Sequence, residues 1–447
     1  MTPTGKLLVL PFSYPYYPRE IVDAQVHEAA RLLGELEPVL VETVFSRADA
    51  RRARERLRIE NPDLVVAVMV SWIEAPNVFD ALRDHLGKPL LVWSHTTIEL
   101  DGRKQTLGAL VAAGVVKQSL ADFGAPFEFV IGRPDDGAVR ERVEAMLRVA
   151  AALNRLRDSR LGLIGYPALG MYTATLDHIT ARKVFGPEIV HIDQYQVVHR
   201  MERIPKEALD GAVENLKAIA RIGEEISAAD LELSSRMFLA LKGIVQENEL
   251  DAVTVKCQYE LSQIFGFTPC VPLSLLGETM PVSCEGDLLT TLTEMLLFLL
   301  SGERVSYADI HEILEDRILV GACGFSPFSL SEKEARCIST WGWEAFSGLL
   351  NSSSLREGRV TIARISRDGS GFKVHVASGK SVGRSDWNEV GCPRYPGTDI
   401  VLDGSTEAFG RELVSNHYAL VFADVVKDVE LSAKWLGIRF ISSGATR

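Results

Sequence analysis

The sequence predicts an α/β protein with two doubly wound parallel-sheet domains followed by a β-rich, barrel-like C-terminal domain. At roughly 100 to 200 residues per domain, 447 residues suggest two or three domains. Up to about residue 300, short runs that are apolar throughout alternate with helical segments, a pattern typical of parallel strands covered on both faces. After about residue 315, short alternating strands separated by glycine-containing turns indicate an antiparallel barrel or small sandwich. We place the domains at 1–157, 158–302 and 303–447.

The first domain is predicted to alternate strands and helices. Strands are expected at 6–11, 38–44, 64–70, 89–93 and 127–131, and helices near 19–34, 47–59, 75–86, 105–121 and 134–156. The basic run 51–58 is expected to be the solvated face of a helix. The first strand-to-helix turn, 11–18, contains no glycine. The dinucleotide-binding fingerprint is therefore absent, and we expect no nicotinamide or flavin cofactor.

A second α/β domain is predicted to begin with the apolar run 161–165. Helices are expected near 172–184, 205–225 and 228–249, with a strand at 188–192. The loop 165–172 carries glycines at a spacing that fits neither a P-loop nor a Rossmann turn. Because ligands bind beyond the carboxyl ends of strands in such sheets, we interpret it as a ligand-facing loop.

Two carboxylates follow strands in the stretch 251–311. Strands are expected at 251–257, 280–284 and 305–309, and leucines at helical spacing predict a helix from 288 that stops at Ser301-Gly302. We interpret strand 280–284, the helix from 288 and strand 305–309 as a crossover unit whose two strands are parallel. Glu285 and Asp309 then lie at the same edge of one sheet and can face one pocket. Asp287, directly ahead of the helix, is interpreted as its N-cap.

The C-terminal domain is predicted from strands and a final helix. The strands are expected at 359–365, 372–378, 399–402 and 417–423, and the helix at 428–436. His417 follows Asn416 and begins a strand rather than lying inside an apolar face.

Composition excludes several classes of function. The formal net charge of −12 argues against nucleic acid or an anionic membrane as a partner, because both attract basic surfaces. The six cysteines form no C-x-x-C pair, and most lie in apolar runs as reduced core cysteines do. With no apolar run near 18 residues and no signal peptide, we expect a cytoplasmic protein.

Taken together, these motifs resemble the L-fucose isomerase family, with L-arabinose isomerase as a more distant relative. The resemblance rests on two α/β domains, the turn Cys284-Glu-x-Asp287, an Ala-Asp ending at Asp309, and an Asn-His opening a strand at 416–417. The layout agrees over most of the chain, whereas only short motifs agree in letters. The turn after Val320 reads Gly-Ala-Cys-Gly where polar pocket residues are expected.

The resemblance implies roles for particular residues. Glu285, Asp309 and His417 would bind Mn²⁺ or another divalent cation, and the two carboxylates would form the acid/base pair. Gln258, Asn416 and Trp72 would contact the substrate. The family also implies a homo-oligomer, a hexamer or trimer, in which the first domain of one subunit covers the site of the next.

Elementary chemistry supports the same residue types. Interconverting an aldose and a ketose moves a proton between C1 and C2, so the enediolate needs a cation beside its oxygens and a carboxylate base beside the carbon. Two carboxylates and an imidazole suit a hard divalent ion and leave positions open for sugar oxygens.

Several alternatives remain open from the sequence. An isomerase or epimerase for an unusual sugar, sulfonated or branched, would carry the same three ligands, because pocket polarity sets substrate choice. A sugar-binding protein built from two α/β domains would need no metal. Other charged or aromatic residues can also have purely structural roles. Glu260 can be a lysine-paired or exposed glutamate, His95 and His178 structural histidines, and Trp72 an ordinary core residue.

Overall fold

The chain forms two compact units, residues 1–154 and 155–447. The structure is a computed structural model that describes residues 5–168, 170–341, 346–384 and 396–444. The division falls in the last turn of α5 (Gly137–Asp158), close to the predicted boundary at 157. The predicted boundary at 302 separates two sheets of the second unit rather than two compact units.

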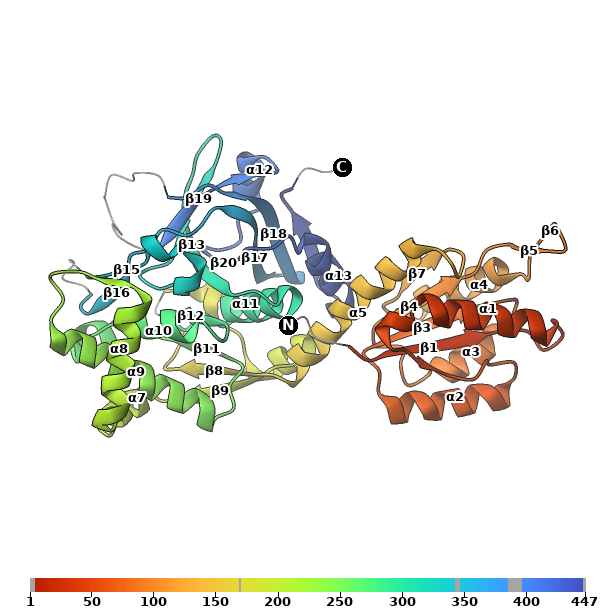
Figure 1. Cartoon of the computed structure of the whole chain (residues 1–447), viewed down its shortest axis with the longest axis horizontal. Helices are drawn as coiled ribbons and strands as arrows, with labels where there is room; N and C mark the ends of the chain where they lie inside the picture. Colours follow the sequence, from red (N-terminus) through yellow and green to blue (C-terminus); the bar gives the residue numbers. More distant parts are fainter. Residues whose placement is uncertain (1–4, 169, 342–345, 385–395, 445–447) are drawn as a thin grey trace. The chain divides into compact units, whose positions relative to one another are not determined.

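The first unit is a doubly wound α/β domain, as predicted (Figure 1). Its five parallel strands have the order β2-β1-β3-β4-β7. Residues of β1 and β3 are buried at every position, which explains why their sequences are apolar throughout. The strands are β1 (Leu7–Phe12), β2 (Val39–Leu40), β3 (Leu64–Met69), β4 (Leu90–Ser94) and β7 (Glu128–Ile131); the helices before α5 are α1 (Arg19–Leu32), α2 (Arg47–Glu60), α3 (Ala75–Leu82) and α4 (Ala109–Asp122).

Two predicted elements of this unit are shorter than expected. The helix predicted at 105–121 begins at Ala109, because a hairpin of β5 (Ile98–Leu100) and β6 (Arg103–Gln105) precedes it. Asp101 and Gly102 join these strands with positive φ at both positions, as a two-residue hairpin turn requires. The strand predicted at 38–44 is only β2 plus an isolated bridge between Val44 and Phe12.

The second unit contains a four-stranded parallel sheet with the order β12-β11-β8-β9. Its strands are β8 (Arg160–Ile164), β9 (Glu188–Ile192), β11 (Ala252–Val255) and β12 (Val282–Cys284). Its helices are α7 (Tyr195–Met201), α8 (Lys206–Ile219), α9 (Ala228–Glu247), α10 (Cys270–Leu276) and α11 (Leu288–Ser301).

Two helix predictions were wrong in this unit. In place of one helix at 172–184 there are short helical pieces, because Asp177 caps a new start at α6 (His178–Thr180). The helix predicted at 205–225 ends at Ile219, since β10 (Arg221–Ile222) pairs with β15 (Cys337–Thr340). That small sheet, completed by β16 (Leu349–Asn351), depends on a pairing between distant segments.

The C-terminal strands form a six-stranded antiparallel barrel, which confirms the barrel rather than the sandwich (Figure 1). The order is β17-β20-β13-β14-β19-β18, and a pairing of β18 with β17 closes the ring. The strands are β13 (Val305–Ile313), β14 (Ile318–Gly321), β17 (Gly358–Asp368), β18 (Gly371–Ser381), β19 (Gly397–Leu402) and β20 (His417–Val421); α12 (Thr406–Arg411), α13 (Val426–Leu436) and β21 (Arg439–Ser442) complete the unit.

The predicted parallel crossover between β12 and β13 was wrong. β13 belongs to the barrel, where it runs antiparallel to β14 and β20, and not to the sheet of β12. The helix between them, α11, packs against β11 and β12 on one side and against β17 and β20 on the other. Because of this position nearly all of α11 is buried. A helix that is covered on several faces is apolar all round, which explains its leucine-rich sequence. Glu285 and Asp309, which precede and follow α11 in the chain, nevertheless both lie within 4 Å of His417 Nε2.

Within the described residues, no helix combines the length and the apolar character that crossing a membrane requires.

Candidate active site

Asp309 and His417 lie opposite each other on neighbouring barrel strands. They are register partners in the antiparallel pair β13–β20, so both side chains project from the same face of the barrel wall. His417 Nε2 is 3.2 Å from Asp309 Oδ1. The imidazole is almost fully buried, whereas the Asp309 side chain is 17% exposed. Asp309 therefore lies at the accessible side of the pair.

Glu285 reaches the same place from the end of β12 through a strained turn. Its φ is +61°, a conformation that non-glycine residues rarely adopt and that costs of order 1–3 kcal/mol. Gly286 follows with φ +67°, and a Cβ there would lie 2.4 Å from the carbonyl oxygen of Tyr166. The loop after β8 also fixes the turn, because the Ala168 N–H donates to the Glu285 carbonyl at 2.7 Å. Strain held in this way is typical of functional positions.

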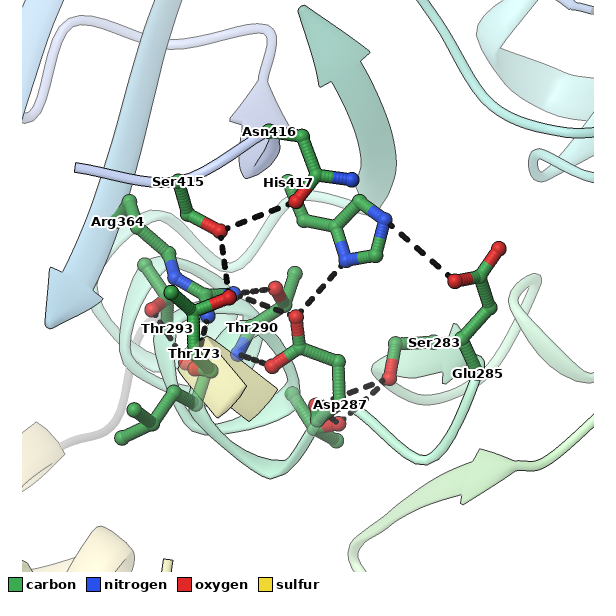
Figure 2. Close-up of polar contacts among 12 residues, drawn as sticks. Thr173, Ser283, Glu285, Asp287, Thr290, Thr293, Arg364, Ser415, Asn416 and His417 are labelled. Carbon is green, nitrogen blue, oxygen red and sulfur yellow. Dashed lines mark hydrogen bonds and ion pairs between the residues drawn. The ribbon is translucent and has the colours of Figure 1, made fainter. Parts of the chain in front are cut away.

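The three predicted ligands converge. His417 Nε2 is 3.8 Å from Glu285 Oε2 (Figure 2). The same nitrogen faces Asp309. Glu285 is 8% exposed. His417 Nε2 thus lies within 4 Å of two carboxylates that come from two different sheets.

Asp287 fixes the orientation of this imidazole. Its Oδ1 accepts the backbone N–H of Thr290 at 2.9 Å and so caps α11, as predicted. Its Oδ2 accepts from His417 Nδ1 at 2.8 Å and from Arg364 Nη1 at 2.8 Å (Figure 2). Because an ionised carboxylate only accepts, Nδ1 carries a proton, and Nε2 is the nitrogen directed at Glu285 and Asp309.

The pKa values reflect burial and the crowding of negative charge. Burial alone would lower the pKa of His417, but Asp309 and Asp287 raise it to about 10. Burial raises the pKa of Glu285 to about 8, with a further contribution from Cys257. Burial opposes ionisation of Asp287, yet Arg364 and His417 hold its pKa at about 2. Positive charge is therefore strongly favoured between these carboxylates.

The donor set fits a hard divalent cation. Two carboxylates and an imidazole are common ligands of such ions, and a carboxylate that accepts from the second ring nitrogen is the usual partner of a metal-binding histidine. The cation would supply the positive charge that an imidazolium supplies otherwise, and binding would release the proton on Nε2. Glu285, Asp309 and His417 would hold the ion.

The buried Arg364–Asp287 pair gives a prediction about stability. Both side chains are completely buried, so Arg364→Met would break a buried ion pair and leave His417 as the remaining ionisable partner of Asp287, and it should lower the free energy of unfolding by about 3–5 kcal/mol. Arg359→Met, on the same strand, removes pairs with Asp403 and Asp424 from a 43% exposed side chain and should cost about 1 kcal/mol or less. Urea unfolding measures both. Equal losses in the two variants would contradict this account of Asp287.

The predicted substrate-contacting residues have different settings. Asn416 is exposed, and its Nδ2 donates to Asp309 Oδ1 at 3.2 Å. Gln258 is half-buried and follows β11, whose carboxyl end lies at the same sheet edge as that of β12. Trp72 belongs to the first unit, where it is half-buried at the margin of that unit's core.

Three further candidate pocket residues can be compared with the structural roles that the sequence also allowed. Glu260 pairs with Lys256, as a lysine-paired glutamate would, and accepts from Tyr166 Oη at 2.8 Å. His178 is exposed and lies beside His191, with ring centroids 4.7 Å apart. His95 is buried in the first unit against Trp93, and burial lowers its pKa to about 4.

Sequence reasoning missed the second role of Asp287 and all of Arg364. The N-cap signal of Asp287 was visible because it is local in the chain. Its bonds to His417 and Arg364 join residues 130 and 77 positions away, which no local pattern shows.

Comparison with known proteins points to sugar isomerases. No protein-family model matches this chain. The chain is similar to a sulfoquinovose isomerase of Alkalicoccus urumqiensis, 26% identical over 379 residues that cover 82% of this chain and 83% of the relative. A sulfoquinovose isomerase of Priestia aryabhattai is 25% identical over 77% of each chain, and one of Clostridium sp. (strain MSTE9) is 19% identical over 93% and 94%. The similarity therefore extends over most of both proteins and is not confined to one domain.

Proposed function

We propose that this protein is a metal-dependent aldose–ketose isomerase of the L-fucose isomerase-like type, and that its substrate is a sulfonated aldose such as sulfoquinovose. The observation that carries the proposal is that carboxylate oxygens of Glu285 and Asp309 both lie within 4 Å of His417 Nε2. The substrate class is supported by the relatives, which are named sulfoquinovose isomerase. A sulfonated sugar was one of the alternatives that the sequence left open.

The proposed reaction divides the work among these side chains. Mn²⁺ or a similar divalent cation, held by Glu285, Asp309 and His417, would supply positive charge that stabilises the enediolate. Glu285 removes the proton from C2 of the aldose and returns it to C1. Asp309, the more exposed carboxylate, transfers the proton between the hydroxyl and carbonyl oxygens. In the reverse direction the same two groups exchange the roles of acid and base.

Other residues of the site act by positioning. Asp287 holds the His417 ring in one tautomer, and Arg364 keeps Asp287 ionised. Asn416 is exposed and donates to Asp309 Oδ1, which supports the proposal that it contacts the sugar. We also propose a homo-oligomer, a hexamer or trimer, in which Trp72 of one subunit borders the site of another. The three proposed metal ligands all belong to the second unit, so the first unit contributes no metal ligand in this proposal. A monomeric mass in solution would contradict the assembly.

A panel of sugars tests both the reaction and the substrate class. Mn²⁺-loaded protein is incubated with sulfoquinovose, with 6-deoxyglucose and with L-fucose, and ketose formation is followed by NMR. The second sugar is the matched control, because it differs from the first only in lacking the sulfonate group. We expect sulfoquinovose to give the highest kcat/KM, by at least about tenfold, since a site that pairs a charged group rejects the analogue lacking it. Turnover of L-fucose alone would refute the sulfonated substrate, and absence of any ketose would refute the isomerase.

A further inference from the structure

Three cysteines of the second unit lie close to Glu285. Donor atoms of Cys257, Cys284 and Glu285 all lie within 4.8 Å of one another. Cys323 joins this group, because its Sγ is 3.6 Å from Cys284 Sγ and 3.7 Å from Glu285 Oε1. Cys323 therefore lies directly beside a compact group of two thiols and one carboxylate.

The fold brings these cysteines together from separate segments. Cys257 and Cys284 lie at the carboxyl ends of β11 and β12, which are adjacent parallel strands. Cys323 lies in the Gly-Ala-Cys-Gly turn after β14, where the family resemblance leads one to expect polar pocket residues. The cysteines are therefore not a run of neighbouring core residues. Cys257 and Cys284 are buried, whereas Cys323 is partly exposed and gives access to the cluster.

The chemistry of this cluster differs from that of the proposed Mn²⁺ ligands. The cysteines are free, and the 3.6 Å between Cys284 and Cys323 sulfurs is well beyond a disulfide bond of about 2.05 Å. Thiolates are soft ligands that select zinc and similar ions over hard ions such as Mn²⁺. Three sulfurs and one oxygen also make up a four-donor set of the kind that tetrahedral zinc sites use.

We propose that Cys257, Cys284 and Cys323, with Glu285, form a second metal site that binds a thiophilic divalent ion such as Zn²⁺ or Cd²⁺. Binding replaces the thiol protons, which pass to solvent. The site shares Glu285 with the proposed active site, so an ion bound to the thiols withdraws that carboxylate from the sugar. The existence of the thiol site does not depend on the proposed isomerase activity.

Cadmium absorbance tests the site directly. Metal-free, full-length protein, kept reduced with a phosphine, is titrated with Cd²⁺ while the ultraviolet thiolate-to-cadmium charge-transfer band is recorded. We expect the band to saturate at one equivalent. Cys257→Ser and Cys284→Ser should weaken Cd²⁺ binding by about 100-fold or more, because even the partners of metal ligands contribute about 10–100-fold.

Two controls keep the result interpretable. Cys337→Ser removes a cysteine of similar partial exposure outside the cluster and should leave the band unchanged. His417→Ala should also retain the cadmium charge-transfer band, because His417 is not a ligand of the thiol site. Failure of the isomerase assay and failure of the thiol site can therefore be told apart. In the unaltered protein, bound Cd²⁺ should slow alkylation of Cys323 at least tenfold and leave Cys337 unaffected, a readout that needs no variant to fold. Absence of the band, a band that survives in both cluster variants, or equal alkylation of Cys323 with and without Cd²⁺ would overturn the proposal.

Discussion

Glu285→Gln is expected to lower the rate of aldose–ketose isomerisation by about 10²–10⁴-fold, the usual contribution of a general base. The amide cannot accept the C2 proton, although one oxygen remains near His417 and can retain part of the metal affinity. The measurement is ketose formation from sulfoquinovose together with exchange of the C2 hydrogen with solvent, and both rates should fall together.

Glu278→Gln is the matched control for this variant. Glu278 lies in the same unit, where its carboxylate pairs with Arg304 at 2.9 Å and takes no part in the convergence around His417. Its loss should leave the isomerisation rate within about twofold, because Glu278 holds Arg304 and the Ser329 N–H and not the imidazole. If C2 exchange continues unchanged in Glu285→Gln, Glu285 is not the base.

His417→Ala is expected to weaken Mn²⁺ binding by about 100-fold or more, because it removes the nitrogen ligand. Asp287→Asn should weaken binding less, by about 10–100-fold, since Asp287 acts by holding the ring. Electron paramagnetic resonance of free Mn²⁺ measures both affinities without any assay of activity.

The control for the histidine is His191→Ala, an exposed position on β9 of the same unit that should bind Mn²⁺ like the unaltered protein. A graded series, with His417→Ala the weakest and Asp287→Asn intermediate, would support the two distinct roles. Mn²⁺ affinity that is identical in all three variants would place the ion elsewhere.

Much of the fold could be predicted because its signals are local. Apolar runs such as β3 and β11 are buried on both faces, and the leucines of α11 keep helical spacing between Asp287 and Gly302. The direction of β13 could not be predicted, because its partner β20 lies about a hundred residues further along the chain. The short apolar sequence of β13 suits a strand parallel to β12 as well as a strand antiparallel to β20.

The site was predictable only in part for the same reason. The sequence suggested that Glu285 and Asp309 face one pocket, and in the structure both lie within 4 Å of His417 Nε2, although they come from two sheets and not from one. His417 entered through a family resemblance rather than through any pattern of its own. The Asp287–Arg364 pair and the meeting of three cysteines depend on contacts across the folded unit, and the cysteines individually looked like ordinary core residues.

The central claim is proton transfer at a metal-dependent carboxylate–imidazole site, and one isotope measurement tests it most directly. Sulfoquinovose deuterated at C2 is converted in ordinary water by Mn²⁺-loaded protein, by metal-stripped protein and by stripped protein reloaded with Mn²⁺. The account predicts that loaded and reloaded protein form ketose and release deuterium to solvent, and that stripped protein does neither. Ketose formed at an equal rate by stripped protein, verified as metal-free by elemental analysis, or ketose that retains all of its deuterium at C1, would contradict it.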